Sequence, residues 1–141
     1  MKRLMGIDCG DVRTGIAVSD PLGILACGVG TFKAPGRRAL IEIILEQAGK
    51  YEIEEFVVGN PINMNGTLGP RSEKAQAFGK HLEEITGITV VLFDERLSTA
   101  NAHTMLNMTN TRGQKRKSII DEMSACLILQ SYLDRERVSN G

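Results

Sequence analysis

Aromatic residues are scarce, because the sequence has no tryptophan and Phe, Trp and Tyr together make up only 4% of its 141 residues. A platform of aromatic side chains that stacks against nucleic-acid bases is therefore not expected. No excess of charge of either sign exists, since Lys plus Arg and Asp plus Glu number 17 each. The zero formal net charge excludes a strongly basic nucleic-acid coat and leaves room for a local basic patch.

Cysteine is also rare, and its pattern excludes two classes of site. Cys9, Cys27 and Cys126 are odd in number and lack a Cys-x-x-Cys spacing. We therefore expect neither a disulfide framework nor a zinc site, and interpret each cysteine as a small buried hydrophobe. No apolar run approaches the roughly 20 residues of a membrane helix, and Asp8 comes too early for a secretory signal. These absences predict a cytoplasmic protein with no membrane partner.

Apolar periodicity predicts one α/β domain over residues 1–141. Strands are expected over 4–9, 14–19, 24–32, 53–59 and 88–93, helices over 37–50, 70–86, 98–107 and 118–135, and a polar loop over 109–117. The short connections among the first three strands favour an antiparallel meander, whereas the later helix–strand alternation favours parallel neighbours. The prediction is a five-stranded mixed sheet with helices on its faces, and its last strand is expected to be covered on both sides.

One carboxylate lies within the first predicted strand. Asp8 is bracketed by Gly6 and Gly10, and alternation places it on the face that carries Leu4 and Gly6. The glycines leave room for a ligand or a backbone to approach, and a buried carboxylate there needs a cation, hydrogen bonds or solvent. An aspartate that closes the following turn is an equally good interpretation of this residue by itself.

Three further acids lie where ligands often bind. Asp94 and Glu95 follow the strand 88–93, at the carboxyl end where open α/β sheets bind ligands. Adjacent side chains point to opposite faces, so at most one is expected to share a face with Asp8, and the other is expected to pair with Arg96 or cap a helix. Asp121 lies one turn into the last predicted helix on a mostly apolar stripe, although a favourable interaction with the helix dipole also accounts for it.

Together these acids indicate a metal site. Clustered carboxylates repel one another, and a divalent cation relieves that repulsion. Oxygen ligands favour Mg²⁺ or Mn²⁺ over Zn²⁺, and two such ions can promote phosphodiester hydrolysis. A nearby basic run would hold a phosphate backbone, although a solvated loop is the alternative interpretation. That run consists of Arg112, Lys115, Arg116 and Lys117.

Four segments spread over nearly the whole chain form a specific pattern. They are Gly6-Ile7-Asp8-Cys9-Gly10 running on to Asp20, Val57-Val58-Gly59-Asn60-Pro61 leading to Arg71, Asp94-Glu95-Arg96-Leu97-Ser98-Thr99, and residues 117–121 leading into 129–133. Together they resemble the YqgF/RuvX family of Holliday-junction-resolvase-like proteins, described as pre-16S rRNA nucleases. The resemblance implies an RNase H-like fold.

The resemblance also implies an activity and a set of site residues. The implied activity is metal-dependent cleavage at the 5′ end of the 16S rRNA precursor in ribosome biogenesis, with RNA, the small ribosomal subunit or branched DNA as partners. The family's acidic site corresponds to Asp8, Asp121 and either Asp94 or Glu95; similarity to the resolvase branch favours Glu95. Asp8 would bridge Mg²⁺ or Mn²⁺ ions, and Glu95 and Asp121 would complete their ligand shells. The implied phosphate contacts are Arg13, Arg71, Arg96, Arg112, Lys115, Arg116 and Lys117.

Three other functions compete with this interpretation. The hairpin around Asp8 and Gly15 also resembles the phosphate-binding hairpin of sugar kinases and actin-like ATPases, but 141 residues leave no room for their second domain. A non-catalytic RNA-binding assembly factor is the second alternative, and retention of Asp8, Glu95 and Asp121 argues against it. A DNA Holliday-junction resolvase is the third, weakened by the zero net charge.

Overall fold

The computed structural model describes residues 2–10, 12–97 and 113–140, with side chains of the last helix described from 122 to 137. In this part of the chain the strands are β1 (Leu4–Cys9), β2 (Thr14–Ser19), β3 (Ala26–Phe32), β4 (Glu55–Asn60) and β5 (Thr89–Asp94). The helices are α1 (Arg37–Lys50), α2 (Pro70–Thr86) and α4 (Gly113–Asn140), and a 3₁₀ turn, η1 (Glu95–Leu97), follows β5. None of the described helices is both long and apolar enough to cross a membrane.

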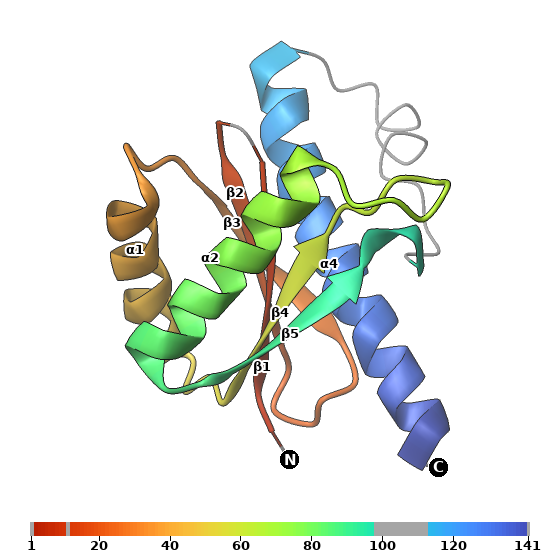
Figure 1. The fold of residues 1–141 in the computed structure, drawn as a ribbon. Coiled ribbons are helices and arrows are strands. Elements are labelled where there is room, and N and C mark those ends of the chain that lie inside the picture. Colours follow the sequence, from red (N-terminus) through yellow and green to blue (C-terminus); the bar gives the residue numbers. More distant parts are fainter. Residues whose placement is uncertain (1, 11, 98–112, 141) are drawn as a thin grey trace.

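The strands form one mixed sheet in the order β3-β2-β1-β4-β5 (Figure 1). β1 pairs antiparallel with β2 and parallel with β4, and β5 pairs parallel with β4. The connection from β1 to β2 is too short to reverse the chain twice, so it forms a hairpin, while α1 and α2 supply the long crossovers that parallel strands need. The predicted five-stranded α/β sheet is confirmed.

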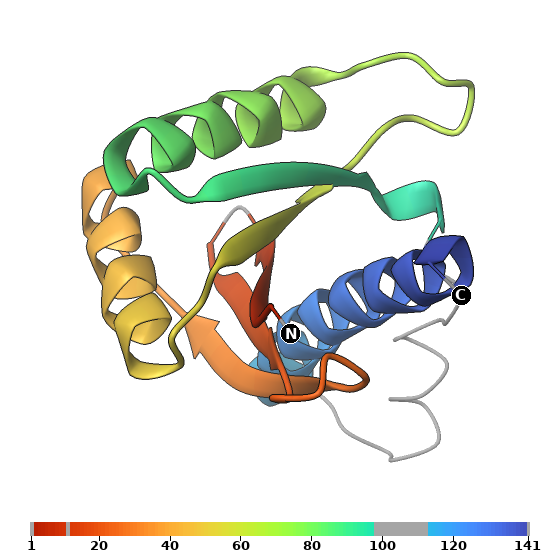
Figure 2. The ribbon, with the colours of Figure 1, turned by 90° about the horizontal axis from the view of Figure 1, so that it is seen from below.

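Each face of the sheet is covered by its own helices (Figure 2). On one face, Met5, Ile7 and Phe56 of the strands pack in a core with residues of α1 and α2. On the other face, Leu4 and Val57 pack in a second core with residues of α4. Odd-numbered residues of β1 therefore face α1 and α2, and even-numbered ones face α4.

The predicted elements are present, and their ends differ from the structure in several places: the strand predicted over 53–59 is β4, Glu55–Asn60, and the last helix runs to Asn140 and not to residue 135. Residues 113–117 begin α4 instead of belonging to a loop, because Gln, Lys and Arg are good helix formers even in a polar stretch. The third strand begins at Ala26 and not at residue 24, because Asp20 binds the preceding residues in a turn: its Oδ1 accepts hydrogen bonds from the Ile24 and Leu25 amides at 2.8 and 3.3 Å. The helix predicted over 98–107 lies outside the described residues.

Two further predictions, on the cover of β5 and on Cys27, differ from the structure at the edges of the sheet. β5 is an edge strand, so the cover predicted on both sides is only partial: Phe93 is 5% exposed beside α4, whereas Leu92, on the face of α2, is 39% exposed. Cys27 is exposed on the other edge strand, β3, so the prediction that each cysteine is buried is wrong for it. Cys9 and Cys126 are half-buried. Edge strands lack a neighbour on one side, which leaves their residues open to solvent.

Candidate active site

Asp8 lies in β1 on the face of the sheet that α4 covers. Its neighbour on that face is Gly6, which α4 approaches closely. A Cβ atom at Gly6 would lie 2.8 Å from Cβ of Leu129 and 3.0 Å from the carbonyl oxygen of Ala125. A side chain at position 6 would therefore push the helix away, and the glycine brings the α4 backbone beside β1. Asp8 is half-buried, two residues farther along the same face.

Glu95 lies on the same face of the sheet, at the end of β5. A Cβ atom at Gly59 would lie 3.2 Å from Cδ of Glu95 and 2.6 Å from Cδ1 of Ile128, so the Glu95 carboxyl group covers the last residues of β4 beside α4. Ile7 pairs with Val58 in the parallel register, so Asp8 and Gly59 follow at the same level of the sheet. The structure thus places Asp8 and Glu95 on one face, at the carboxyl ends of the parallel strands β1 and β5, with the end of β4 at Gly59 between them.

The environment of the Glu95 carboxyl group disfavours its ionised form. Burial raises its pKa above the ordinary value; Arg71 lowers that pKa, and the negative charge of Asp94 raises it. Charges of Asp8 and Glu95 both act on the Cys9 thiol, whose pKa burial raises to about 12. The carboxyl groups of Asp8 in β1 and of Glu95 in η1 are therefore both close enough to Cys9 to influence its pKa.

Asp94 differs from Glu95 in position and partner. Its carboxylate accepts hydrogen bonds from the Arg96 backbone amide at 2.9 Å and from the Arg96 guanidinium, whose Nη2 lies 2.7 Å from Oδ2. These bonds lower the pKa of Asp94. The sequence left both acids open; the structure pairs Asp94 with Arg96 and directs Glu95 to the side of Asp8.

Asp121 belongs to α4, and its backbone position relative to Asp8 follows from the packing of the helix. The Ile128 side chain contacts the end of β4 at Gly59, whereas the Tyr132 hydroxyl lies 3.3 Å from Oε1 of Glu55 at its start. The helix therefore runs opposite to β4, as Figure 1 shows. Ala125 packs at Gly6. The Asp121 backbone precedes Ala125 by one turn, about 6 Å of helix, and Asp8 follows Gly6 by about 6.6 Å of strand, so the two lie at a similar level. The side chain of Asp121 is not among the described ones.

A buried polar contact fixes the first turn of α2 against the end of β4. The Ser72 hydroxyl donates to Oδ1 of Asn60 at 2.6 Å, and both residues are buried. Gln76 donates in turn to the Ser72 hydroxyl at 3.1 Å. Because Arg71 precedes Ser72, this network positions Arg71 near Glu95, where the positive charge of Arg71 lowers the pKa of the glutamate. Arg71, a predicted phosphate contact, therefore lies close to Glu95.

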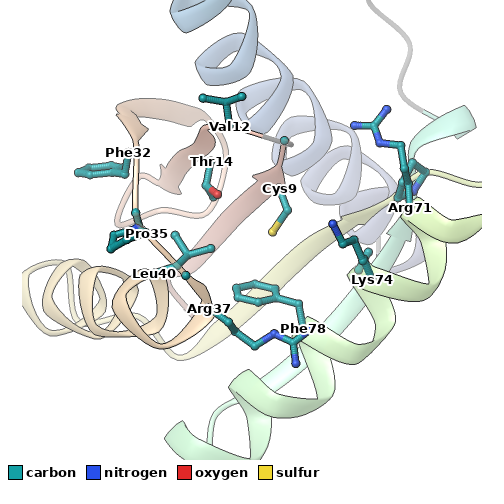
Figure 3. A pocket seen from close by; sticks show the side chains of 15 residues that line it. Cys9, Val12, Thr14, Phe32, Pro35, Arg37, Leu40, Arg71, Lys74 and Phe78 are labelled. Carbon is teal, nitrogen blue, oxygen red and sulfur yellow. The ribbon is translucent and has the colours of Figure 1, made fainter.

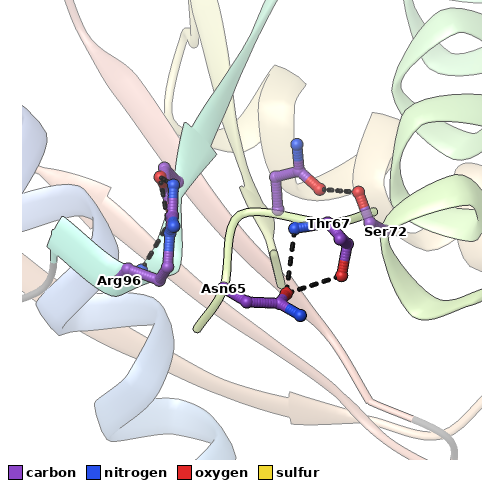
Figure 4. A network of polar contacts seen from close by, with 6 residues as sticks. Asn65, Thr67, Ser72 and Arg96 are labelled. Atoms are coloured by element: carbon purple, nitrogen blue, oxygen red, sulfur yellow. Dashed lines mark hydrogen bonds and ion pairs between the residues drawn. The ribbon is translucent and has the colours of Figure 1, made fainter. Parts of the chain in front are cut away.

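The loop between β4 and α2 is ordered by its own side chains (Figure 4). Oδ1 of Asn65 accepts hydrogen bonds from the Thr67 amide at 3.1 Å and the Thr67 hydroxyl at 2.6 Å. Arg96 lies at the same end of the sheet, and its Nη1 would be 3.9 Å from a Cβ atom at Gly66. The loop therefore passes beside the Asp94–Arg96 pair and borders the site.

The other predicted phosphate contacts differ in how much of each residue the structure describes. Arg13 is half-buried in the β1–β2 hairpin, where its carbonyl accepts a hydrogen bond from the Gly10 amide at 2.9 Å. The backbones of Lys115, Arg116 and Lys117 lie in the first turns of α4, while Arg112 lies outside the described residues. Sequence reasoning missed Lys74, which lies one helical turn after Arg71 and lines a pocket with it. The three-residue spacing on one helix was the available signal.

Comparison with known proteins points to one family. A family model described as RuvX: Holliday junction resolvase matches residues 2–135. A relative from Geobacillus sp. (strain WCH70) is 46% identical over 141 residues, which cover 96% of this chain and 99% of the relative. Another, from Ruminiclostridium cellulolyticum, is 42% identical over 135 residues and 94% of each chain. Both bear the name "Putative pre-16S rRNA nuclease".

Solved structures share the fold at low sequence identity. RuvC from T. thermophilus in complex with a Holliday junction substrate matches with a TM-score of 0.59 at 14% identity, over 96% of each chain. The fowlpox virus resolvase in complex with substrate Holliday junction DNA matches with a TM-score of 0.55 at 10% identity, over 95% of this chain and 98% of its own. The predicted RNase H-like fold is confirmed by these matches.

Proposed function

The chain belongs to the RuvX family of Holliday junction resolvases, and from that premise we propose that it cleaves the 16S rRNA precursor at its 5′ end in a reaction requiring Mg²⁺ or Mn²⁺. Family membership makes it a nuclease, a hydrolase of phosphodiester bonds that binds nucleic acid. The RNA substrate is supported by the names of its relatives. The observation that carries the proposed chemistry is the placement of Asp8 and Glu95 on one face, at the carboxyl ends of β1 and β5 on either side of β4.

The donor set fits a hard divalent cation. Asp8, Glu95 and Asp121 would hold the ion, and their carboxylate oxygens are ligands that Mg²⁺ and Mn²⁺ prefer. Glu95 is half-buried and its pKa is raised, and a cation beside it would favour its ionised form. Among the described side chains no group of three or more His, Cys, Asp or Glu residues could hold a metal, and Asp121 is not among them.

When bound, such ions activate water and stabilise the leaving oxygen in phosphodiester hydrolysis. The residues of the chain hold the reacting phosphate in place. Arg71, fixed by the Asn60–Ser72 contact, carries positive charge beside Glu95 and would orient a non-bridging phosphate oxygen. Arg13, Arg96 and the first turns of α4 with Lys115, Arg116 and Lys117 would contact phosphates farther along the strand, together with Arg112.

Branched DNA is the second candidate substrate, and the family description favours it. The matching family is described by Holliday junction resolvase activity, and the two solved neighbours with the shared fold are complexes with that DNA. RNA and DNA are both joined by phosphodiester bonds, so the choice of substrate depends on how the strand is held. The test must therefore present both substrates to the same preparation.

The decisive experiment is cleavage of a labelled 5′ fragment of the 16S precursor and of a labelled four-way DNA junction. Each is incubated with Mg²⁺, with Mn²⁺ and with EDTA, and the Asp8→Asn protein is purified identically. We expect divalent-ion-dependent RNA cleavage by the wild type and none by the variant. Cleavage of the junction alone would replace the RNA assignment by the DNA one. Equal cleavage by the wild type and Asp8→Asn would refute the assignment of Asp8 to the active site. Binding without cleavage would favour a non-catalytic assembly factor.

A further inference from the structure

A recess lies on the opposite face of the sheet from Asp8 and Glu95. It has a volume of about 350 Å³ and opens between the β1–β2 hairpin, the start of α1 and the first turns of α2 (Figure 3). Cys9 lies at its centre, since alternation turns Cys9 away from the face of Asp8. The volume is within the range of small-molecule pockets in proteins, which begins at roughly 300 Å³.

Three cationic side chains border this recess. Arg37 comes from the first residue of α1, and Arg71 and Lys74 come from α2. Figure 3 shows Lys74 pointing from α2 toward Cys9. None of the three forms an ion pair with a described carboxylate, and none of the described lining residues is acidic. Three like charges around one recess repel one another, and an anion between them would relieve that repulsion.

The other walls of the recess are apolar. Phe32 of β3, Leu40 of α1 and Phe78 of α2 line it, so a ligand must carry a hydrophobic part as well as negative charge. Phe78 is only 5% exposed, because it also belongs to the core beneath α1 and α2. A phosphorylated nucleotide combines the two requirements, since its phosphate suits the cations and its base has an apolar face that stacks on aromatic rings.

Arg71 connects the recess with the candidate active site. It lines the recess, and its positive charge also acts on Glu95 across the end of β4. Asp8 and Cys9 are consecutive residues on opposite faces of β1, so only the end of one strand separates the acidic site from the recess. A nucleic-acid strand held at the acids could therefore place a neighbouring nucleotide in the recess.

We propose that this recess is a binding subsite for a phosphate-bearing nucleotide, with Arg37 and Lys74 holding the phosphate and Phe32 and Phe78 contacting the base. The inference rests on the proposed nuclease function in taking that nucleotide from the substrate strand, next to the cleaved bond. Arg71 serves both sites, whereas Arg37 and Lys74 serve the recess. The same chemistry could be supplied by a free nucleotide, and the experiment separates the two sources.

The test measures binding without cleavage. A fluorescently labelled single-stranded RNA hexamer is titrated with protein in EDTA, and anisotropy is recorded over a range of salt concentrations. Arg37→Ala and Lys74→Ala are compared with Arg38→Ala and Lys80→Ala, exposed cations on the same helices that do not line the recess. Each control removes the same charge. We expect each recess variant to weaken binding about fivefold to twentyfold, and to reduce the salt slope by about one.

Competition with adenosine 5′-monophosphate and with adenosine identifies the ligand. We expect the monophosphate to displace the hexamer and adenosine to fail, because the cations hold the phosphate. A hexamer that binds far more tightly than the monophosphate assigns the subsite to the substrate strand, and equal affinity assigns it to a free nucleotide. Equal displacement by adenosine, or equal affinity of recess and control variants, would overturn the proposal.

The two proposals can fail separately. If the RNA fragment is cleaved and the recess variants bind like their controls, the nuclease stands and the subsite falls. If no fragment is cleaved and binding in EDTA still depends on Arg37 and Lys74, the subsite stands without the nuclease. Thermal melts followed by circular dichroism check the fold of each variant, and unchanged melting is expected because both side chains are exposed.

Discussion

At the level of single residues, two adjacent carboxyl groups differ in what surrounds them. Asp94 is neutralised by Arg96, and its pKa is lowered by hydrogen bonds. Glu95 covers Gly59 beside α4, and burial raises its pKa. Paired and satisfied carboxylates serve structure, whereas a carboxyl group whose pKa is shifted by desolvation and by neighbouring charges is a candidate for function. The two neighbours therefore have different expected roles.

Substitution of each acid by its amide tests this difference. We expect Asp8→Asn and Glu95→Gln to fold normally, because volume hardly changes, and to lose about 1000-fold in cleavage rate, since several kcal/mol of charge stabilisation depends on such carboxylates. Asp94→Asn should stay within about threefold of the wild type, since an exposed ion pair contributes little. Single-turnover cleavage rates measure the effect. A larger loss in Asp94→Asn than in Glu95→Gln would reverse the assignment.

At the level of elements, α4 packs closely on glycines of the sheet, two of which, Gly6 and Gly59, lie in β1 and β4. A Cβ atom at Gly6 would meet the α4 backbone at Ala125 and Cβ of Leu129, neither of which can rotate away. A Cβ atom at Gly59 would meet the end of the Ile128 side chain, which can move, and the Glu95 side chain. The first glycine therefore governs the distance between helix and sheet, and the second the position of Glu95.

Alanine at these positions should separate stability from activity. We expect Gly6→Ala to lower the free energy of unfolding by about 1–3 kcal/mol through overpacking. Compared with Gly6→Ala, Gly59→Ala should lower the free energy of unfolding less and reduce the cleavage rate more, because it displaces Glu95. Gly49→Ala is the control, since nothing lies within 4 Å of an added Cβ atom there. Urea unfolding and cleavage rates measure both effects, and equal loss of stability at positions 6 and 59 would contradict this account.

The turn between β2 and β3 depends on the charge of Asp20. Its Oδ1 accepts hydrogen bonds from the Ile24 and Leu25 amides, and the first of these is the main cause that lowers the pKa of Asp20 below its ordinary value of 3.8. A carboxyl group with a lower pKa in the folded state stabilises the fold above its unfolded pKa, and that contribution is lost as pH falls through the folded pKa. The turn should therefore weaken in acid.

Asp20→Asn isolates this titration, because the amide oxygen can still accept the hydrogen bonds but cannot ionise. We expect the wild type to lose more stability than the variant when the pH falls from 7 to below 3.8. Denaturant unfolding at the two pH values gives the difference. A variant with the same pH dependence as the wild type would show that Asp20 does not contribute.

At the level of the whole molecule, the two faces of the sheet carry different chemistry. On the face covered by α4, Asp8 and Glu95 lie at the carboxyl ends of β1 and β5. On the face covered by α1 and α2 lies the recess bordered by three cationic side chains. The formal charge of the chain is zero, so binding of nucleic acid must come from local clusters of charge. Three separate elements, β1, η1 and α4, supply the proposed metal ligands.

A metal ion held by three elements should stabilise the folded chain as a whole. We expect Mg²⁺ or Mn²⁺ at ten times its Kd to raise the Tm of the wild type by about 4 °C or more, because the ion binds the folded state. EDTA should reverse the change, and Asp8→Asn should show none of it. Differential scanning calorimetry without nucleic acid measures this. Equal shifts in both proteins would place the ion elsewhere.

Much of the architecture could be predicted because it is local. Alternation in β1 placed Asp8 on the face of Gly6, and the α2 boundaries followed from Pro70 and Gly87, which begin and end helices for steric reasons. The strand at 24–32 was predicted too long, because the Asp20 turn competes with apolar residues that also favour a strand. The polar stretch at 113–117 was misjudged because polarity alone does not separate a loop from an exposed helix.

The sequence by itself determined the order of strands and helices, the family pattern and the set of acids, because each strand, helix and motif is recognised from residues close together in the chain. The resemblance favoured Glu95 over Asp94, but only the tertiary structure showed Glu95 beside Gly59 and Ile128 on the face of Asp8. It alone brought Arg37 of α1 beside Lys74 of α2 in one recess. Contacts of this kind join residues far apart in the sequence, and packing of helices on the sheet decides which of them meet.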